Sequence, residues 1–130
     1  MHVDRRAIGR RGEELAADHL VRRGFSILDR NFRTRWGELD IVAFDGRTLV
    51  FCEVKSRRCW CPQSRGEETA AVAFESLHPR KRHQVRRMAK IWMSNRLERP
   101  YAPLVRFDAI GVTFQEGGEL VRLDHLEGAF

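Results

Sequence analysis

The segment from Trp36 to Arg57 constrains the fold more than any other part of this chain, because it predicts two strands joined by a tight turn. Asp45-Gly46 is a strong hairpin signal, since both residue types tolerate a positive φ. Side chains two residues apart share a face of a strand. The first strand has one face with Glu38, Asp40, Val42 and Phe44, and another with Leu39, Ile41 and Ala43. The second strand has one face with Leu49, Phe51, Glu53 and Lys55, and another with Val50, Cys52 and Val54.

Two registers of this hairpin are compatible with the pattern. A two-residue loop places Asp40 diagonal to Glu53, whereas a four-residue loop, from Asp45 to Thr48, places the two carboxylates directly opposite each other. Either register brings Asp40, Glu53 and Lys55 to one face of the sheet. Two carboxylates and an ammonium are costly on a half-buried strand face unless they have partners or a purpose.

The Asp-(x)12-Glu-x-Lys pattern of these three residues predicts a site for metal-assisted phosphodiester hydrolysis. Mg²⁺ prefers oxygen ligands and is usually held by one or two carboxylates together with substrate phosphate. Such an ion orients a water molecule, lowers its pKa and stabilises charge in the transition state. Lys55 can position that water or stabilise the developing negative charge. The alternative reading is a cross-strand salt bridge on a solvated face.

The segment 3–24 predicts a helix, with Asp4 as N-cap and Gly24 as the C′ residue. On a helical wheel Glu13 lies about 100° from the centre of the apolar stripe, and Glu14 lies nearly opposite that stripe. We therefore expect Glu13 to reach the edge of the core or a neighbouring sheet, and Glu14 to remain in water. The stripe itself consists of Ile8, Gly12, Leu15, Ala16 and Leu20.

The rest of the chain predicts an α/β fold of order α-β-β-β-α-β-β in a single domain, residues 1–130. A short strand at 25–32, ended by Asn31 and the charges after it, precedes the hairpin. A long loop at 57–78, a helix at 79–97, a linker at 100–103 and strands at 104–114 and 119–126 follow.

A loop as long as the one at 57–78 usually indicates function or disorder. Its Cys59 and Cys61 form a single C-x-C pair, which is weak support for zinc. Arg106 and Asp108, on the strand at 104–114, either pair with each other or face the site.

The chain is basic, with 24 Lys+Arg against 18 Asp+Glu and a net charge of +6. This balance favours a polyanionic partner, most often nucleic acid, although Arg-rich usage can also reflect the base composition of a genome. In the helix at 79–97 the apolar stripe is Val85, Met88, Ala89 and Trp92. The cations on the same helix predict phosphate contacts, and the alternative is a solvated charged face. They are Arg80, Arg82, His83, Arg86, Arg87 and Lys90.

Several other classes of protein find no support in the sequence. The first residues are charged and lack the apolar segment of a signal peptide, and no run reaches the roughly 18 apolar residues that span a bilayer. Three cysteines fit reduced thiols better than a disulfide framework, so we expect a cytoplasmic protein without a membrane partner. The sequence contains no P-loop, no Gly-x-Ser-x-Gly and no His-x-x-x-His pair.

The chain resembles the YraN family of bacterial proteins, which is related to archaeal Holliday junction resolvases. The resemblance spans nearly the whole chain and is carried by Gly9, Glu13-Glu14-Leu15-Ala16-Ala17, Gly37-Glu38-Leu39-Asp40-Ile41-Val42, Val50-Phe51-Cys52-Glu53-Val54-Lys55-Ser56-Arg57, Lys81, Arg106-Phe107-Asp108 and Ala129-Phe130. It implies a restriction-endonuclease-like fold with a PD-(D/E)xK-type site. By this resemblance Asp40 and Glu53 are the metal-binding carboxylates, Lys55 is the catalytic lysine and Glu13 is the first-helix glutamate. Glu38 belongs to the same motif.

The leading hypothesis is a metal-dependent endonuclease, or nuclease-like protein, acting on branched or structured DNA with Mg²⁺ or Mn²⁺. Resolvases usually act as dimers, so a homodimer is part of this expectation. One alternative is a nucleic-acid-binding module with a relic site that no longer cuts, and a weaker one is a protein-interaction adaptor. The expected nucleic-acid contacts are Arg57, Arg80, Lys81, Arg82, Arg86, Arg87 and arginines of the first helix.

Overall fold

The computed structural model describes residues 5–59, 79–96 and 100–130, without the side chains of Arg5 and Cys59. Helix α1 (Arg5–Arg22) precedes strands β1 (Ser26–Thr34), β2 (Gly37–Phe44) and β3 (Thr48–Cys59). Helix α3 (Pro79–Asn95) and strands β4 (Leu104–Gln115) and β5 (Leu120–Leu126) follow. The predicted fold class, α/β with the order α-β-β-β-α-β-β, is confirmed.

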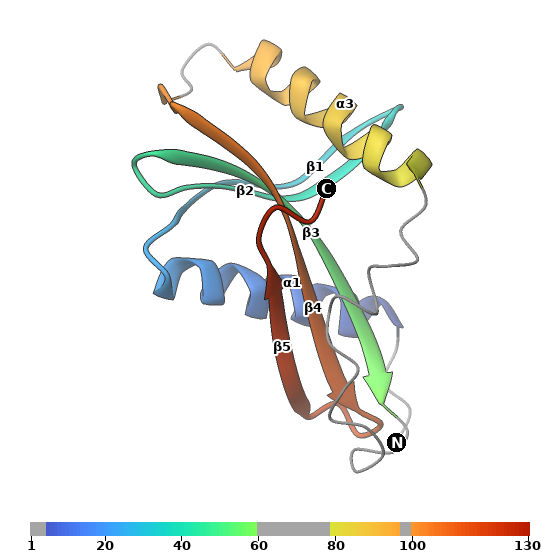
Figure 1. The fold of residues 1–130 in the computed structure, drawn as a ribbon. Coiled ribbons are helices and arrows are strands. Elements are labelled where there is room, and N and C mark those ends of the chain that lie inside the picture. Colours follow the sequence, from blue (N-terminus) through green and yellow to red (C-terminus); the bar gives the residue numbers. More distant parts are fainter. Residues whose placement is uncertain (1–4, 60–78, 97–99) are drawn as a thin grey trace.

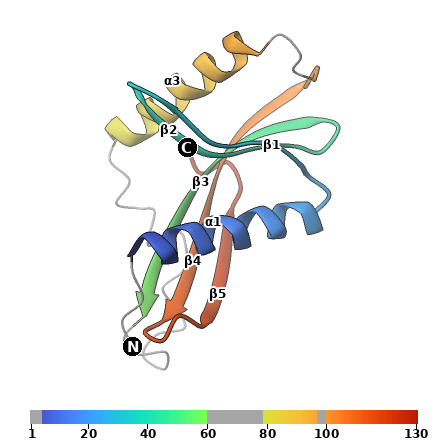
Figure 2. The ribbon, with the colours of Figure 1, turned by 180° about the vertical axis from the view of Figure 1, so that it is seen from behind.

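The five strands form one mixed sheet in the order β1-β2-β3-β4-β5. Strands β3 and β4 are parallel, and the other neighbouring pairs are antiparallel. Parallel neighbours require a crossover connection, and here α3 lies between them in the chain. Figures 1 and 2, seen from opposite sides, show α1 and α3 on opposite faces of the sheet. Each face is therefore covered by one helix.

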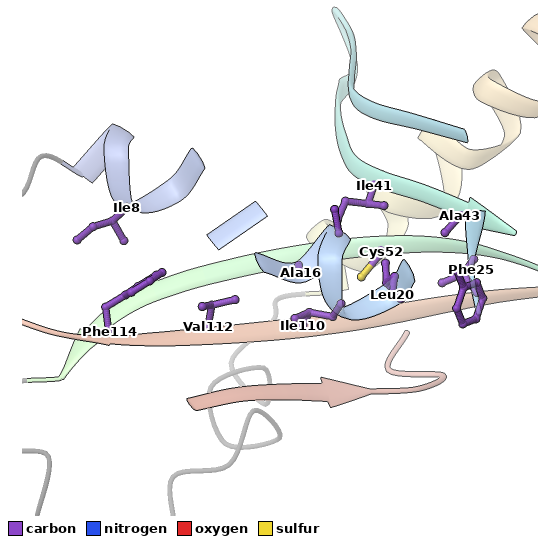
Figure 3. Packing of buried hydrophobic residues seen from close by; sticks show 12 residues of the cluster. Ile8, Ala16, Leu20, Phe25, Ile41, Ala43, Cys52, Ile110, Val112 and Phe114 are labelled. Atoms are coloured by element: carbon purple, nitrogen blue, oxygen red, sulfur yellow. The ribbon is translucent and has the colours of Figure 1, made fainter. Parts of the chain in front are cut away.

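Two apolar clusters fill the spaces between the sheet and its helices. On the α1 side, Ala16 and Leu20 pack against Cys52, Ile110 and other sheet residues, as Figure 3 shows. On the α3 side, Trp92 stands edge-on to Phe51, with ring centroids 5.7 Å apart. The buried residues of α3 are the predicted stripe, Val85, Met88, Ala89 and Trp92. The period-3.6 pattern therefore identified the packed face of this helix correctly.

Helix α1 ends as the sequence predicts and packs closely on β3. Gly24 has φ +95°, and the Phe25 N–H donates to the Leu20 carbonyl at 3.0 Å, as in a Schellman C-cap. Asp4, the predicted N-cap, lies outside the described residues. Gly12 faces Ser56 so closely that a Cβ atom at position 12 would overlap the Ser56 hydroxyl. The absence of a side chain at Gly12 is therefore what lets the helix approach the strand.

Strand β1 corrects one prediction, because Asn31 bends the strand rather than ending it. The strand continues to Thr34, and Asn31 adopts φ 54°, a left-handed conformation that asparagine tolerates better than most residues. Across the ladder, Leu39 packs on the α3 side whereas Ile41 packs on the α1 side. The predicted common face of Leu39 and Ile41 is therefore wrong, because the strict alternation of faces is interrupted at Asp40, which lies between them.

Other boundaries differ in smaller ways. Strand β3 extends to Cys59, so the predicted loop does not begin at residue 57, and its remainder, including Cys61, lies outside the described residues. Helix α3 ends at Asn95 rather than at residue 97. Within the described parts of the chain, neither helix is long and apolar enough to cross a membrane.

Candidate functional site

Asp40 and Glu53 lie where β2 and β3 separate. The ladder pairs Phe44 with Leu49 and ends at Ile41–Cys52, so the four-residue-loop register is correct and the two-residue alternative is wrong. In this register Asp40 and Glu53 would be the next pair. Val54 lies beyond the last β2–β3 pair, and its N–H donates to Asp40 Oδ2 at 2.8 Å. The Asp40 carboxylate is therefore the acceptor for a β3 backbone N–H at the point where the β2–β3 ladder ends.

The two carboxyl groups are electrostatically coupled. Burial, then the charge of Glu53, raises the pKa of Asp40 to about 8, despite the hydrogen bond from Val54. Burial also raises the pKa of Glu53, while Lys81 and a hydrogen bond with Asp40 oppose that rise. Like charges this close and this buried disfavour double ionisation. Without a cation, the pair therefore retains a proton near neutral pH.

Glu13, Glu38 and Asp40 form a three-carboxylate cluster. One oxygen of each lies within 4.8 Å of the others, and the three come from α1, the start of β2 and its middle. Hard divalent cations bind oxygen at about 2.0–2.6 Å, so two oxygens on opposite sides of one ion are about 4–5 Å apart. The 4.8 Å limit within the cluster agrees with this separation. Glu38 is also paired with the exposed Arg33 at 3.4 Å. The donor set fits Mg²⁺ or Mn²⁺, with room in the coordination shell for water or phosphate.

Glu53 is not one of the three clustered carboxylates and instead forms an ion pair with Lys81. Its Oε1 lies 3.0 Å from the Lys81 ammonium, which reaches it from α3. Both side chains are largely shielded, with 15% of Glu53 and 35% of Lys81 exposed. The structure thus places Glu53 next to Asp40, as predicted, but pairs it with a lysine that the sequence had suggested for phosphate contact.

Sequence reasoning left Glu38 without a role and missed Lys81 as a partner of Glu53. A signal for Glu38 was present, since it lies two residues before Asp40 on the same strand. No local pattern could have indicated Lys81, because 28 positions separate it from Glu53 and only the packing of α3 brings the two together.

Lys55 is exposed on β3 and makes no ion pair or hydrogen bond with any residue that the structure describes. Two residues further, Arg57 lines a pocket of about 550 Å³ together with Glu13 and Ser56. The Ser56 hydroxyl and one Arg58 nitrogen are buried there without a hydrogen-bond partner among the described residues. The predicted catalytic lysine therefore lies beside the carboxylates along the strand, but its ammonium is not held against them.

The cations of α3 fall into two groups. Arg80, Arg82 and Arg87 are exposed. Arg86 is exposed as well, but it donates to the Phe130 carbonyl at 2.8 Å and lies over the Phe107 ring. Arg86 is therefore partly committed to the C-terminal segment, and Arg87 lies over the Trp36 ring, 3.8 Å from its centroid.

Arg106 and Asp108 pair with each other, which was one of the two sequence expectations. The fully buried Asp108 accepts from Arg106 Nε at 2.8 Å and from the Gly128 N–H at 3.0 Å. His125 Nε2 lies 2.7 Å from the same carboxylate. Burial would raise the pKa of Asp108, but the hydrogen bonds with His125 and Arg106 more than offset it, so this pKa is lowered. This network ties β5 and the chain after it to β4.

Comparison with known proteins shows that the chain is similar to one family over most of its length. The model described as "Uncharacterised protein family UPF0102" matches residues 12–112. A UPF0102 protein of Frankia alni is 46% identical over 125 residues, covering 95% of this chain and 94% of the relative. One of Pelotomaculum thermopropionicum is 41% identical over 126 residues, covering 97% of each. One of Geobacter metallireducens is 36% identical over 132 residues, covering 100% and 97%.

Proposed function

The chain belongs to the UPF0102 family, and on that premise we propose that it is a metal-dependent endonuclease acting on branched or structured DNA. The observation that carries the proposal is the convergence of carboxylates from α1, β2 and β3, with the pKa of Asp40 raised to about 8. Strongly perturbed carboxyl groups held together in this way are more typical of a functional site than of a structural ion pair.

Glu13, Glu38 and Asp40 would hold Mg²⁺ or Mn²⁺. A divalent ion held by these residues would supply Lewis-acid chemistry, since it would polarise a phosphodiester and lower the pKa of a water ligand. The Val54 N–H orients Asp40, and Lys81 keeps a positive charge beside Glu53. Lys55 is placed to approach a substrate from solvent, since no described residue holds it back.

The exposed cations of α3 supply the contacts with the DNA backbone. Arg80 and Arg82 lie in the first turn of the helix whose Lys81 contacts Glu53, so phosphates bound by them would run past the carboxylates. Phosphate contacts orient a nucleic acid without reading its sequence. Such contacts fit an enzyme that recognises the shape of a branch.

The test is cleavage of four-way junction, flap and flush duplex DNA, with Mg²⁺, with Mn²⁺ or with EDTA. We expect metal-dependent cutting of branched DNA that Asp40→Asn abolishes, while Glu14→Gln, a solvent-exposed neighbour of Glu13, leaves it unchanged. Cutting that survives Asp40→Asn, or no cutting of any DNA in either metal, contradicts the proposal.

One observation favours the alternative of a binding protein with a relic site. Lys81 already neutralises Glu53, and Lys55 is not held at the carboxylates. That alternative predicts salt-dependent DNA binding that is unchanged by Asp40→Asn, and no measurable Mn²⁺ affinity. Calorimetric titration of Mn²⁺ into the wild type and Asp40→Asn separates the two functions.

A further inference from the structure

Trp36, at the turn between β1 and β2, is a large aromatic side chain that the core does not use. It remains 42% exposed, whereas Trp92 is fully buried. Its backbone is fixed at both ends, because its N–H donates to Thr34 Oγ1 at 3.0 Å and its carbonyl accepts from Gln84 Nε2 at 2.9 Å. The partly exposed indole therefore projects from a turn whose backbone is held against α3.

Two guanidinium groups lie over this indole ring, so a base that stacks on it has to displace one of them. Arg87 lies 3.8 Å from the ring centroid and Arg35 lies 4.6 Å from it. A pocket of about 500 Å³ adjoins the ring, and the described residues that line it, which include no acidic residue, are Trp36, Pro79, Arg80, His83, Gln84 and Arg87. An exposed aromatic ring among cations suits a ligand that has a flat π-face and a negative charge, as a nucleotide does.

The pocket is adjacent to the carboxylate cluster. Trp36 precedes Glu38 by two residues, about 7 Å along an extended strand. On α3, Gln84 and Lys81 are one helical turn apart; the former contacts the Trp36 carbonyl and the latter contacts Glu53. A nucleotide seated at Trp36 would therefore have its phosphates close to the acidic site.

We propose that Trp36 is a stacking platform for one unpaired nucleobase of the DNA strand that the carboxylates cut. The proposal rests on the function proposed above and deepens it by naming the substrate feature that is read. In a flush duplex each base face is already covered by its neighbours. A flap or a gap offers an unpaired base or an uncovered base face within the duplex, so stacking on Trp36 selects such DNA over continuous duplex.

The test compares DNA affinities by fluorescence anisotropy in EDTA, so that no cutting occurs. The probes are a labelled duplex with a short central gap and the same duplex without the gap. From the usual strength of base–aromatic stacking, Trp36→Ala should weaken binding of the gapped probe about tenfold and leave the flush probe within about twofold. Trp36→Phe keeps a ring and should retain most of the affinity for the gapped probe. It also guards against a folding defect in Trp36→Ala.

The matched control is Arg82→Ala, which removes an exposed cation of α3 outside the pocket. As a phosphate contact it should weaken both probes to the same degree. Equal weakening of both probes by Trp36→Ala, or no weakening of either, overturns the stacking proposal while leaving the nuclease proposal intact. Failure of the wild-type protein to bind either probe overturns the function proposed above, and the stacking proposal with it.

Discussion

The carboxyl group of Asp40 combines burial, a carboxyl neighbour and a single backbone donor. Only 9% of the residue is exposed, and the nearby Glu13, Glu38 and Glu53 all add negative charge. A folded protein gains nothing in stability from this arrangement without a cation, because ionised Asp40 is then both desolvated and repelled. A bound divalent ion removes that penalty, which is the physical reason to regard the cluster as a metal centre.

Metal binding should therefore be coupled to proton release. Since the pKa of Asp40 is about 8, the folded protein holds a proton there at pH 7 that a metal must displace. We expect Mn²⁺ affinity to rise with pH up to about 8, and titrations at pH 7 in buffers of different ionisation enthalpy to show proton release. An affinity that is constant from pH 6 to pH 8 would contradict the proton-bound state of Asp40.

The same shift has a signature in the metal-free protein. The pKa of Asp40 is raised above its unfolded value of about 3.9, so the folded state binds the extra proton between those values. The contribution of this bound proton to the free energy of unfolding is complete below the unfolded pKa of Asp40, and it is lost as pH rises towards 8. Thermal unfolding in EDTA should show a melting temperature that falls over this window, and the fall should be smaller in Asp40→Asn.

The Lys81–Glu53 pair gives a second prediction at the residue scale. Lys81→Met leaves Glu53 buried beside Asp40 without its cation, so the pKa of Glu53 should rise further. Because Lys81 is partly exposed, we expect a loss of only about 1 kcal/mol in unfolding free energy at pH 8. Lys90→Met, an exposed position on the same helix, is the control. Equal changes in unfolding free energy for the two substitutions, measured by urea unfolding, would show that the Lys81–Glu53 pair contributes no more to stability than an exposed lysine does.

At the scale of elements, the contact between α1 and β3 sets the position of Glu13. Gly12 precedes Glu13 and approaches Ser56 without a side chain between them. A wider separation of helix and strand would carry Glu13 away from Glu38 and Asp40. The close approach at Gly12 is therefore a condition of the carboxylate cluster as well as of the core.

Two glycines of α1 provide a matched pair for testing that contact. Gly12→Ala inserts a methyl group against Ser56 and should destabilise the protein by about 1–3 kcal/mol. Gly9→Ala has open space around the new atom and should stabilise the helix by about 0.5–1 kcal/mol. Urea unfolding of both variants measures the difference. If Gly12→Ala were as stabilising as Gly9→Ala, the close packing of α1 on β3 would be incorrect.

The helices, caps and turns could be predicted well because residues close together in the sequence determine them. The stripe of α3, the C-cap at Gly24 and the Asp45 turn all follow from short-range periodicity or backbone preference. The bend at Asn31 was missed because asparagine is typical of both strand ends and left-handed residues within strands. The alternation of faces is also interrupted near Asp40 on β2, so a strict two-residue period described this part of the site incompletely.

At the scale of the whole molecule, the candidate site is an assembly of separate elements. The cluster draws on α1 and β2, its neighbour Glu53 lies on β3, and Lys81 comes from α3. The sequence predicted Asp40, Glu53 and Glu13 from strand and helix geometry within single segments. It could not predict that α3 would deliver an ammonium to Glu53, since that depends on how both helices pack on the sheet.

The basic surface and the carboxylate cluster have opposite charge, yet they lie close together. Cations on α3 attract DNA, while the carboxylates repel its phosphates unless a metal ion lies between them. DNA can therefore bind the cations of α3 without a metal ion, but its phosphates can approach the carboxylates closely only with a divalent ion bound there. The metal centre is thus the claim on which the proposed function depends.

That claim is tested most directly by a crystal structure of the protein with Mn²⁺, located by its anomalous scattering. We predict one strong anomalous peak at the cluster, with ligand distances of about 2.2 Å to oxygens of Asp40 and of Glu13 or Glu38. The peak should be absent from Asp40→Asn crystals treated in the same way. Saturating Mn²⁺ with no peak at these carboxylates would contradict the metal centre, and with it the proposed nuclease.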